Sequence, residues 1–188
     1  MFGRGSAFKD FFYIFIGFFI GGGVVLNGAV FAGSTGNAGA IGSMPVPSRG
    51  KKPSQLIDAA SVHLLETKLK AAKIDPSPLW LQPENWDGFG KHLDAWIAEI
   101  AGPLAHAIAA TCSVVDFPAV IIDGGFPPAV RRRIVAATRS ALAAFDLQGI
   151  AAPAIVEGEA GPNARAIGGA SLPLLNRYIL DPTSFVKA

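Results

Sequence analysis

The chain opens with a run of apolar residues that predicts strands. Positions 11–32 are almost entirely aromatic, aliphatic, β-branched or glycine residues, with Tyr13 and Asn27 as the hydrogen-bonding side chains. Aromatic and β-branched residues favour strands. The Asn27-Gly28 pair is typical of a tight hairpin, because both residues tolerate a positive φ. We therefore predict strands over 11–17, 23–26 and 29–31.

The same run has two other interpretations. Its length is close to the ~20 apolar residues of a membrane-spanning helix. Arg4 and Lys9 before it, and small residues at its end, resemble a signal peptide. Against both, Gly21-Gly22-Gly23 in its centre disfavours a helix by about 1 kcal/mol per glycine relative to alanine. We expect strands, no membrane segment and a cytoplasmic protein; an exported or membrane-tethered protein is the alternative.

Helical periodicity and short apolar runs alternate in the rest of the chain. After a loop over 33–54 that is rich in Gly, Pro and Ser, apolar spacing predicts a helix over 55–72 and another from 83 to about 112. Gly102-Pro103 predicts a kink or break in the second helix. Further on we predict a strand over 119–122, a helix from Pro127 or Pro128 to about 145, a strand over 154–156 and a helix over 163–180.

This order of elements predicts an α/β fold. Strands that alternate with helices indicate a partly parallel sheet covered by helices. The opening hairpin makes that sheet a mixed one.

Composition narrows the classes of function. The 188 residues fit one domain, and an apolar fraction of 51% with a mean hydropathy of +0.40 excludes intrinsic disorder. A single cysteine, Cys112, excludes a disulfide framework and a multi-cysteine zinc site within the chain. The net charge of +2 gives no sign of a nucleic-acid-binding surface.

Four glycine-containing segments, in this order, resemble the C-terminal lobe of the ROK family of repressors, unassigned open reading frames and sugar kinases. They are residues 16–28, 36–44, 120–126 and 161–170. The resemblance covers about 11–180 and implies an actin-like ATPase (ribonuclease H-like) lobe, a mixed β-sheet flanked by helices. It also implies that residues 1–188 form a single C-terminal lobe, without the nucleotide-clasping first lobe and without the helix-turn-helix of the family's repressors.

The resemblance places two nucleotide loops, both degenerate. In the family's kinases the loop that matches residues 17–23 resembles Gly-Thr-Gly-Ile-Gly-Gly-Gly, and its N–H groups and hydroxyl approach the phosphates. Here Phe18 stands at the hydroxyl position and Phe19 at a glycine position, and bulky rings obstruct an anion nest. The candidate nucleotide-binding residues are Gly21, Gly22, Gly23, Gly124 and Gly125. A strand connection and a strand-to-helix turn are the structural alternatives for the two stretches.

The sugar-binding positions of the family are altered as well. The sugar loop of the kinases resembles Gly-x-Ala-Gly-Glu-x-Gly-His; Ala40 replaces its Glu and Ser43 its His. Ile57 falls at the Glu of the zinc-binding run, which is missing. The resemblance leaves Asn37 and Ser43 as candidate sugar-binding residues, with Asn37 alternatively a turn residue with positive φ. We assign no catalytic residue, no metal and no zinc, and the three histidines show no metal-ligand spacing.

Several conspicuous residues have structural interpretations. We interpret Arg131-Arg132-Arg133 as a solvated helix face rather than a nucleic-acid contact. Trp80, Trp86 and Trp96 are expected to be packing anchors rather than sugar-stacking rings. Cys112 is expected to be an inert core thiol.

The expected function is a non-catalytic, sugar-kinase-like regulatory domain. It would be the effector-sensing and dimerisation half of a transcriptional regulator, binding a small sugar, needing no cofactor and contacting DNA only through a domain outside this chain. The alternative is a truncated ATP-dependent sugar kinase, with ATP-Mg as its cofactor. A single lobe would leave its apolar lobe-facing surface uncovered, so we expect a homodimer or larger assembly.

Overall fold

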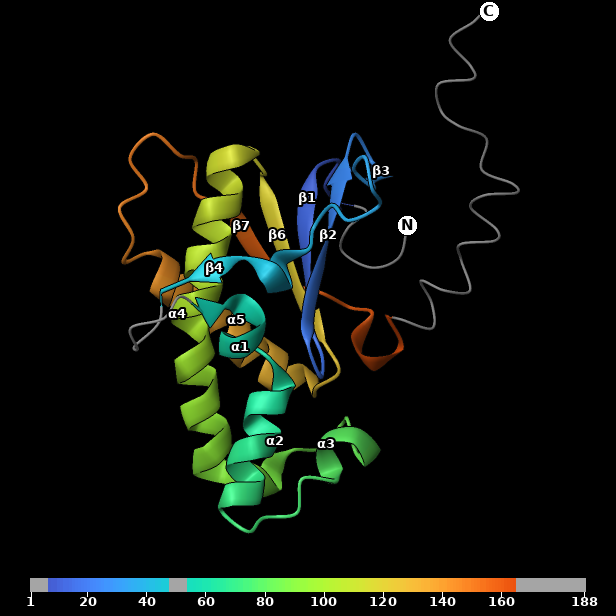
Figure 1. The fold of residues 1–188 in the computed structure, drawn as a ribbon, viewed down its shortest axis with the longest axis vertical. Coiled ribbons are helices and arrows are strands. Elements are labelled where there is room, and N and C mark those ends of the chain that lie inside the picture. The colour runs from blue at the N-terminus through green and yellow to red at the C-terminus, as the bar shows by residue number, and fades with distance from the viewer. Residues whose placement is uncertain (1–6, 48–53, 165–188) are drawn as a thin grey trace, which may run out of the picture.

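A five-stranded mixed sheet forms the centre of the molecule (Figure 1). The computed structural model describes residues 7–47 and 54–164. The strands, in the spatial order β3-β2-β1-β6-β7, are β3 (Ala29–Phe31), β2 (Ile20–Leu26), β1 (Phe11–Ile16), β6 (Ala119–Gly124) and β7 (Ala154–Glu157). β1 pairs antiparallel with β2 and parallel with β6, and β6 pairs parallel with β7. The predicted mixed sheet is confirmed.

The opening apolar run forms the predicted hairpin at Asn27-Gly28. Asn27 and Gly28 have φ of 53° and 77°, and Leu26 pairs with Ala29 across the turn. Asn27 N–H also donates to Asp10 Oδ1 at 2.6 Å. β2 is longer than predicted, since it begins at Ile20 and includes the three glycines. Residues 11–31 therefore form three strands joined by short turns, and no helix.

The helices follow the predicted order with different boundaries. They are α1 (Leu56–Ala59), α2 (Val62–Ala71), α3 (Pro78–Leu81), α4 (Gly90–Val114) and α5 (Pro128–Leu142). Three short 3₁₀ turns, η2 (Ile41–Ser43), η3 (Asp87–Phe89) and η4 (Gly161–Asn163), and a small β4 (Pro45–Val46) and β5 (Ser54–Gln55) ribbon complete the described elements. The helix predicted over 163–180 lies, from residue 165 on, outside the described residues.

Two helix predictions were wrong in detail. The helix predicted over 55–72 is divided at Ala60-Ser61, where Ser61 is extended and its carbonyl oxygen accepts a hydrogen bond from Trp96 Nε1 at 3.0 Å. Of the kink or break predicted at Gly102-Pro103, the break does not occur, since α4 continues through both residues. Ile100 and Leu104 on either side are fully buried, and this burial offsets the hydrogen bond that the proline cannot donate.

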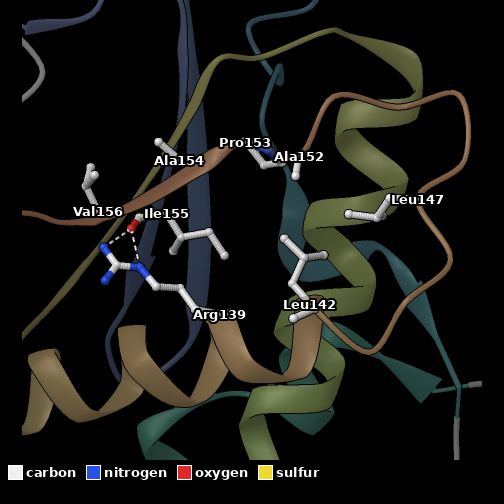
Figure 2. Close-up of a pocket in the computed structure, with 9 residues that line it drawn as sticks. Arg139, Leu142, Leu147, Ala152, Pro153, Ala154, Ile155 and Val156 are labelled. Atoms are coloured by element: carbon white, nitrogen blue, oxygen red, sulfur yellow. Dashed lines mark hydrogen bonds between the residues drawn. The ribbon is translucent and has the colours of Figure 1, made fainter.

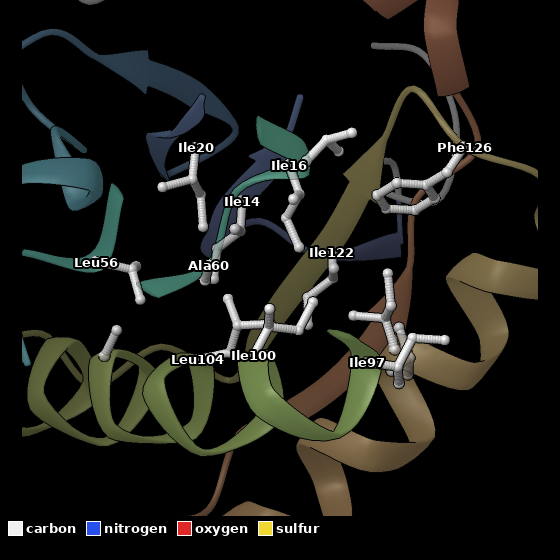
Figure 3. Packing of buried hydrophobic residues seen from close by; sticks show 14 of the residues in the cluster. Ile14, Ile16, Ile20, Leu56, Ala60, Ile97, Ile100, Leu104, Ile122 and Phe126 are labelled. Atoms are coloured by element: carbon white, nitrogen blue, oxygen red, sulfur yellow. The ribbon is translucent and has the colours of Figure 1, made fainter. Parts of the chain in front are cut away.

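The core lies between one face of the sheet and α4 and α5. Along β1, Phe12, Ile14 and Ile16 are buried while the residues between them are half-buried. Figure 3 shows Ile14 and Ile16 pointing toward the helix that carries Ile100. Trp86 and Trp96 are almost fully buried, which confirms them as packing anchors, whereas Trp80 is 42% exposed. Burial also raises the pKa of the Cys112 thiol, as expected for an inert core cysteine.

Residues 87–114 are long and apolar enough to cross a membrane, with a mean hydropathy of 1.4 over the best window. The core helix of a soluble protein meets the same criterion, and 44% of this window is buried inside the fold. In this structure α4 packs against α1, α2 and α5. Its apolar composition is accounted for by that packing.

Leu104→Ala tests whether this face of α4 carries the core. Because Leu104 is fully buried, the truncation should lower the free energy of unfolding by ~2–5 kcal/mol. Val114→Ala on the same helix is the matched control: Val114 is 84% exposed, and its truncation should change stability by less than ~0.5 kcal/mol. Urea titrations followed by circular dichroism measure both, and equal effects would contradict this packing.

Candidate functional site

The carboxyl ends of β1 and β6 meet at one edge of the sheet. They are parallel neighbours, and Ile16 at the end of β1 lies opposite Gly124 at the end of β6. Ligands of open α/β sheets bind at such carboxyl ends. A pocket of about 180 Å³ lies there, which we call the slot. Its lining residues are Phe15, Gly17, Leu79, Trp80, Pro83, Gly125 and Pro162.

The turn that follows β1 has its carbonyl groups tied to a helix. Val62 N–H donates to Gly17 O at 2.9 Å and His63 N–H donates to Phe18 O at 3.2 Å, both from the first turn of α2. Within the turn, Gly17 N–H donates to Phe19 O at 2.9 Å. A helix start and a glycine-rich turn attract anions through free N–H groups. Here these three N–H groups are occupied by backbone carbonyl groups.

Aromatic rings surround this turn. Phe18 contacts Phe19, His63 and Trp80, with ring centroids 4.7, 5.0 and 5.7 Å apart. We call these four residues the aromatic cluster. Phe18 and Phe19 are 39% and 51% exposed, and His63 Nδ1 lies 4.0 Å from Glu66 Oε2. The cluster is thus an exposed aromatic surface beside the slot.

Gly21, Gly22 and Gly23 do not form a loop, as the nucleotide-loop interpretation required. They lie in β2, opposite Phe15, Ile14 and Tyr13 of β1. A Cβ on Gly22 would come within 2.8 Å of the carbonyl oxygens of Gly39 and Tyr13, whereas Gly21 and Gly23 face open space. Close backbone packing therefore requires a glycine at the middle position, and the strand connection given as the alternative for this stretch was wrong, since all three glycines lie within β2.

The second predicted nucleotide loop also begins later than expected. Asp123 and Gly124 are the last residues of β6, and only Gly125 lies in the turn. A Cβ on Gly124 would collide with Ile16 O and the Phe126 ring. Gly125 has open space around it and lines the slot. The two predicted nucleotide loops thus both reach the edge where β1 and β6 end, one through Gly17 and the other through Gly125. Gly21–Gly23 lie farther along β2.

Asp123 is the residue that sequence reasoning missed. Its side chain is fully buried, and its carboxylate accepts hydrogen bonds from Tyr13 Oη and Ala160 N, both at 2.9 Å. Gly124 N and Gly161 N donate to the same carboxylate at 2.8 and 3.1 Å. The sequence did contain a signal for this role. Asp123 directly follows the four apolar residues 119–122 of the predicted strand, a position where a carboxylate is buried and needs hydrogen-bond partners.

Arg131 is the cationic partner of Asp123. Its Nη1 donates to Asp123 Oδ1 at 3.1 Å, and its Nε lies 3.8 Å from Glu157 Oε2. The Arg131 side chain is only 12% exposed, so its interpretation as part of a solvated helix face was wrong. Arg133 does match that interpretation, since it makes an exposed ion pair with Asp94.

The environment of Tyr13 keeps its phenol protonated. Burial, followed by the charge of Asp123 and the hydrogen bond to it, raises the pKa of Tyr13 far above its ordinary value of 10, while Arg131 acts in the opposite direction. Tyr13 therefore serves as a permanent hydrogen-bond donor to the buried carboxylate at ordinary pH.

The two candidate sugar-binding residues lie away from the slot lining. Asn37 and Ser43 are both exposed. Gly36 and Gly39 have positive φ, but Asn37 does not, so its alternative as a positive-φ turn residue was wrong. Ser43 lines a pocket of about 420 Å³ whose other lining residues are mostly apolar, including Phe12 and Met44. The residues given as lining this pocket do not include Asn37.

A further pocket, of about 410 Å³, opens beside the edge strand β7 (Figure 2). Arg139 from α5 extends along it, and its Nε donates to Ile155 O at 2.8 Å. Leu142 and Leu147 supply apolar surface. Within residues 7–47 and 54–164, no group of three or more His, Cys, Asp or Glu side chains is placed to hold a metal ion.

Comparison with known proteins identifies this architecture. Residues 1–55 match the model of the ROK family. A ROK family protein from Streptococcus pneumoniae TIGR4, solved in complex with sucrose, has a TM-score of 0.69 at 18% identity, over 91% of this chain and 60% of that one. The chain is a fragment of the ROK fold. Its resemblance to the family and its actin-like ATPase class are thereby confirmed.

Both enzymes and regulators share this fold. The ROK hexokinase from Thermus thermophilus has a TM-score of 0.62 at 24% identity, over 89% of this chain and 58% of the hexokinase. A ROK family transcriptional regulator, a homolog of the E. coli MLC protein, also has a TM-score of 0.62, at 21% identity, over 83% of this chain and 43% of the regulator. The chain thus spans about three fifths or less of these ROK proteins. No curated protein matches the sequence significantly.

Gly22→Ala tests the role of the glycine stretch in this fold. The added methyl group has no room between two carbonyl oxygens, so the variant should lose ~1–3 kcal/mol of stability. Gly23→Ala is the neighbouring control, since its Cβ meets open space, and it should be neutral or up to ~1 kcal/mol more stable. Denaturant titrations measure the free energy of unfolding of both variants. A Gly22→Ala variant as stable as the wild type would refute the packing requirement.

Tyr13→Phe tests the buried network through its pH dependence. The raised pKa of Tyr13 means that its stabilising contribution is fully present below pH 10, the ordinary value, and is lost as pH rises above it. Tyr13→Phe should be less stable by ~1 kcal/mol at neutral pH. Its stability should also fall less steeply above pH 10 than that of the wild type. If the free energies of unfolding of the two proteins, measured by urea titration, fall equally steeply above pH 10, this role of Tyr13 is excluded.

Proposed function

We propose that this chain acts as a non-catalytic, sugar-kinase-like ROK regulatory domain in the cytoplasm. In this proposal it senses a small sugar effector and provides the dimerisation half of a transcriptional regulator, with DNA contacted by a domain outside these 188 residues. The observation that carries the proposal is the turn after β1. Phe18 and Phe19 form an aromatic cluster there, and the turn carbonyls are bonded to the start of α2.

Phosphoryl transfer depends on positioning and on charge. The phosphates of a nucleotide need free N–H donors and cationic groups or Mg²⁺ at the turn. In this chain Val62 and His63 N–H groups are occupied, and none of the seven residues that line the slot is charged. Arg131, the cationic side chain of the buried network, is paired with Asp123. These features disfavour a triphosphate at this edge.

A neutral carbohydrate is the class of effector that we propose for this chain. The Streptococcus ROK protein of similar fold was solved in complex with sucrose, which supports a neutral carbohydrate as the ligand. Asn37 and Ser43 are the candidate contacts, since their exposed side chains can donate and accept hydrogen bonds. The apolar pocket beside Ser43 would receive the less polar face of such a ring.

A sugar kinase is the second candidate. A ROK glucokinase from Streptomyces griseus with a similar fold was solved in complex with glucose and AMPPNP, at 22% identity and a TM-score of 0.63. On this alternative the chain would be part of an ATP-dependent kinase. The first lobe would then supply the phosphate loop and catalytic aspartate, and reading the nucleotides upstream of the Met1 codon would reveal a continuing frame that encodes them.

Calorimetric titration with ATP-Mg and with a panel of hexoses and amino sugars tests the proposal. We expect no heat of binding for ATP-Mg and measurable binding of at least one sugar, weakened by Ser43→Ala. Phe145→Ala removes a partly exposed ring that lies tilted against His106 and lines neither the slot nor the pocket of Ser43; it is the control and should leave sugar binding unchanged. Micromolar binding of ATP-Mg, together with sugar phosphorylation by the full-length protein, would overturn the proposal in favour of the kinase.

A further inference from the structure

The tight turn between β2 and β3 has the sequence Asn27-Gly28. This is the one Asn-Gly pair among the 188 residues. Both residues are exposed. Asparagine followed by glycine is the pair most prone to deamidation, because glycine has no side chain to hinder the attack of its backbone nitrogen on the asparagine amide. The turn therefore carries a reactive pair at the surface.

We propose that Asn27 is a deamidation site whose reactivity is controlled by two hydrogen bonds between the turn and residues 9 and 10. In the reaction Gly28 N forms a bond to Asn27 Cγ, the Cγ–Nδ2 bond breaks, and ammonia leaves with the proton of Gly28 N. One water molecule then opens the five-membered imide at either carbonyl carbon and gives aspartate or isoaspartate. Water is the only reactant consumed. The site does not depend on which ligand the chain binds, so it stands apart from the proposed function.

The fold restrains the attacking nitrogen. Gly28 N–H donates to Lys9 O at 2.7 Å, and Gly28 N must lose this proton when it attacks. Asn27 N–H donates to Asp10 Oδ1 at 2.6 Å, which ties the other residue of the turn to the same segment. Breaking two hydrogen bonds without new partners costs free energy. Attack therefore requires the turn to separate locally from residues 9 and 10.

The geometry of the turn opposes ring closure as well. Leu26 pairs with Ala29 across the turn, and a two-residue turn of this kind requires a positive φ at both central residues. Asn27 and Gly28 meet that requirement, with φ of 53° and 77°. Closure of the imide ring rotates ψ of Asn27 away from its value in the turn. Deamidation is therefore slow while the hairpin is closed and fast once it opens.

The products would alter the hairpin. Isoaspartate adds one methylene group to the backbone, so the turn could no longer join Leu26 and Ala29 in register. Aspartate keeps the backbone but adds a negative charge to a turn that already contacts the Asp10 carboxylate. β3 is an exposed strand at the border of the sheet. It is thus the element that the modification would release.

Incubation of the intact chain at mildly alkaline pH, folded or unfolded in guanidinium chloride, tests the proposal by mass spectrometry. The tryptic peptide 10–49 contains both Asn27 and Asn37, and fragment spectra assign the conversion of an amide to a carboxyl group to one of them. We expect Asn27 to deamidate at least about tenfold more slowly in the folded chain, because it reacts only through local opening. Asn37, which precedes Ala38, is the internal reference and should react more slowly than Asn27 in the unfolded chain.

Two variants at Asp10 test the control by the hydrogen bond. Asp10→Ala removes the acceptor of Asn27 N–H, so Asn27 in the folded variant should deamidate about threefold faster or more. Asp10→Asn keeps an oxygen acceptor at the same place and is the matched control, with a rate within about twofold of the wild type. Circular dichroism establishes that both variants remain folded.

Three results would overturn the inference. The first is an equal rate of deamidation at Asn27 in the folded and the unfolded chain. The second is an unfolded chain in which Asn27 stays unmodified. The third is a folded Asp10→Ala variant that reacts no faster than Asp10→Asn. None of these results bears on the sugar and ATP-Mg titrations, so the inference and the proposed function fail separately.

Discussion

The buried carboxylate of Asp123 joins the parts of the molecule that form the candidate site. It accepts hydrogen bonds from β1 through Tyr13 and from the segment after β7 through Ala160 and Gly161, and it pairs with Arg131 of α5. A buried ion pair contributes little net stability, because desolvation cancels much of the attraction. Its strong effect is on geometry, since a charge buried in this way must keep all its partners. The edge where β1 and β6 end is held in one arrangement for that reason.

Much of the fold could be predicted from local patterns. The Asn27-Gly28 turn gave the hairpin at the correct residues, since the requirement for positive φ is a local property of those two residues. The break between α1 and α2 could not be predicted in this way. It depends on a hydrogen bond from Trp96 to Ser61, two residues 35 positions apart in the chain. The continuity of α4 through Pro103 likewise depends on burial by other elements.

The candidate site was predictable in its location and less so in its detail. The resemblance to the ROK family pointed to the ends of two strands, and these ends do meet. The family's nucleotide loop matches residues 17–23, but in this structure Gly21–Gly23 lie inside β2, and of the three only Gly22 satisfies a close approach to the segment at Gly39. Arg131 was taken for a surface residue, since charge runs usually are. Only the three-dimensional position of Asp123 reveals its pairing.

The hydrogen bond from Arg139 to Ile155 O lies on the edge strand β7. β7 is one border of the sheet, and a bare border strand is a template onto which a foreign extended peptide can add. The guanidinium occupies a main-chain acceptor there, so the sheet is closed to strand addition at that place. A chain as rich in apolar residues as this one is protected there from edge-to-edge aggregation by a single side chain.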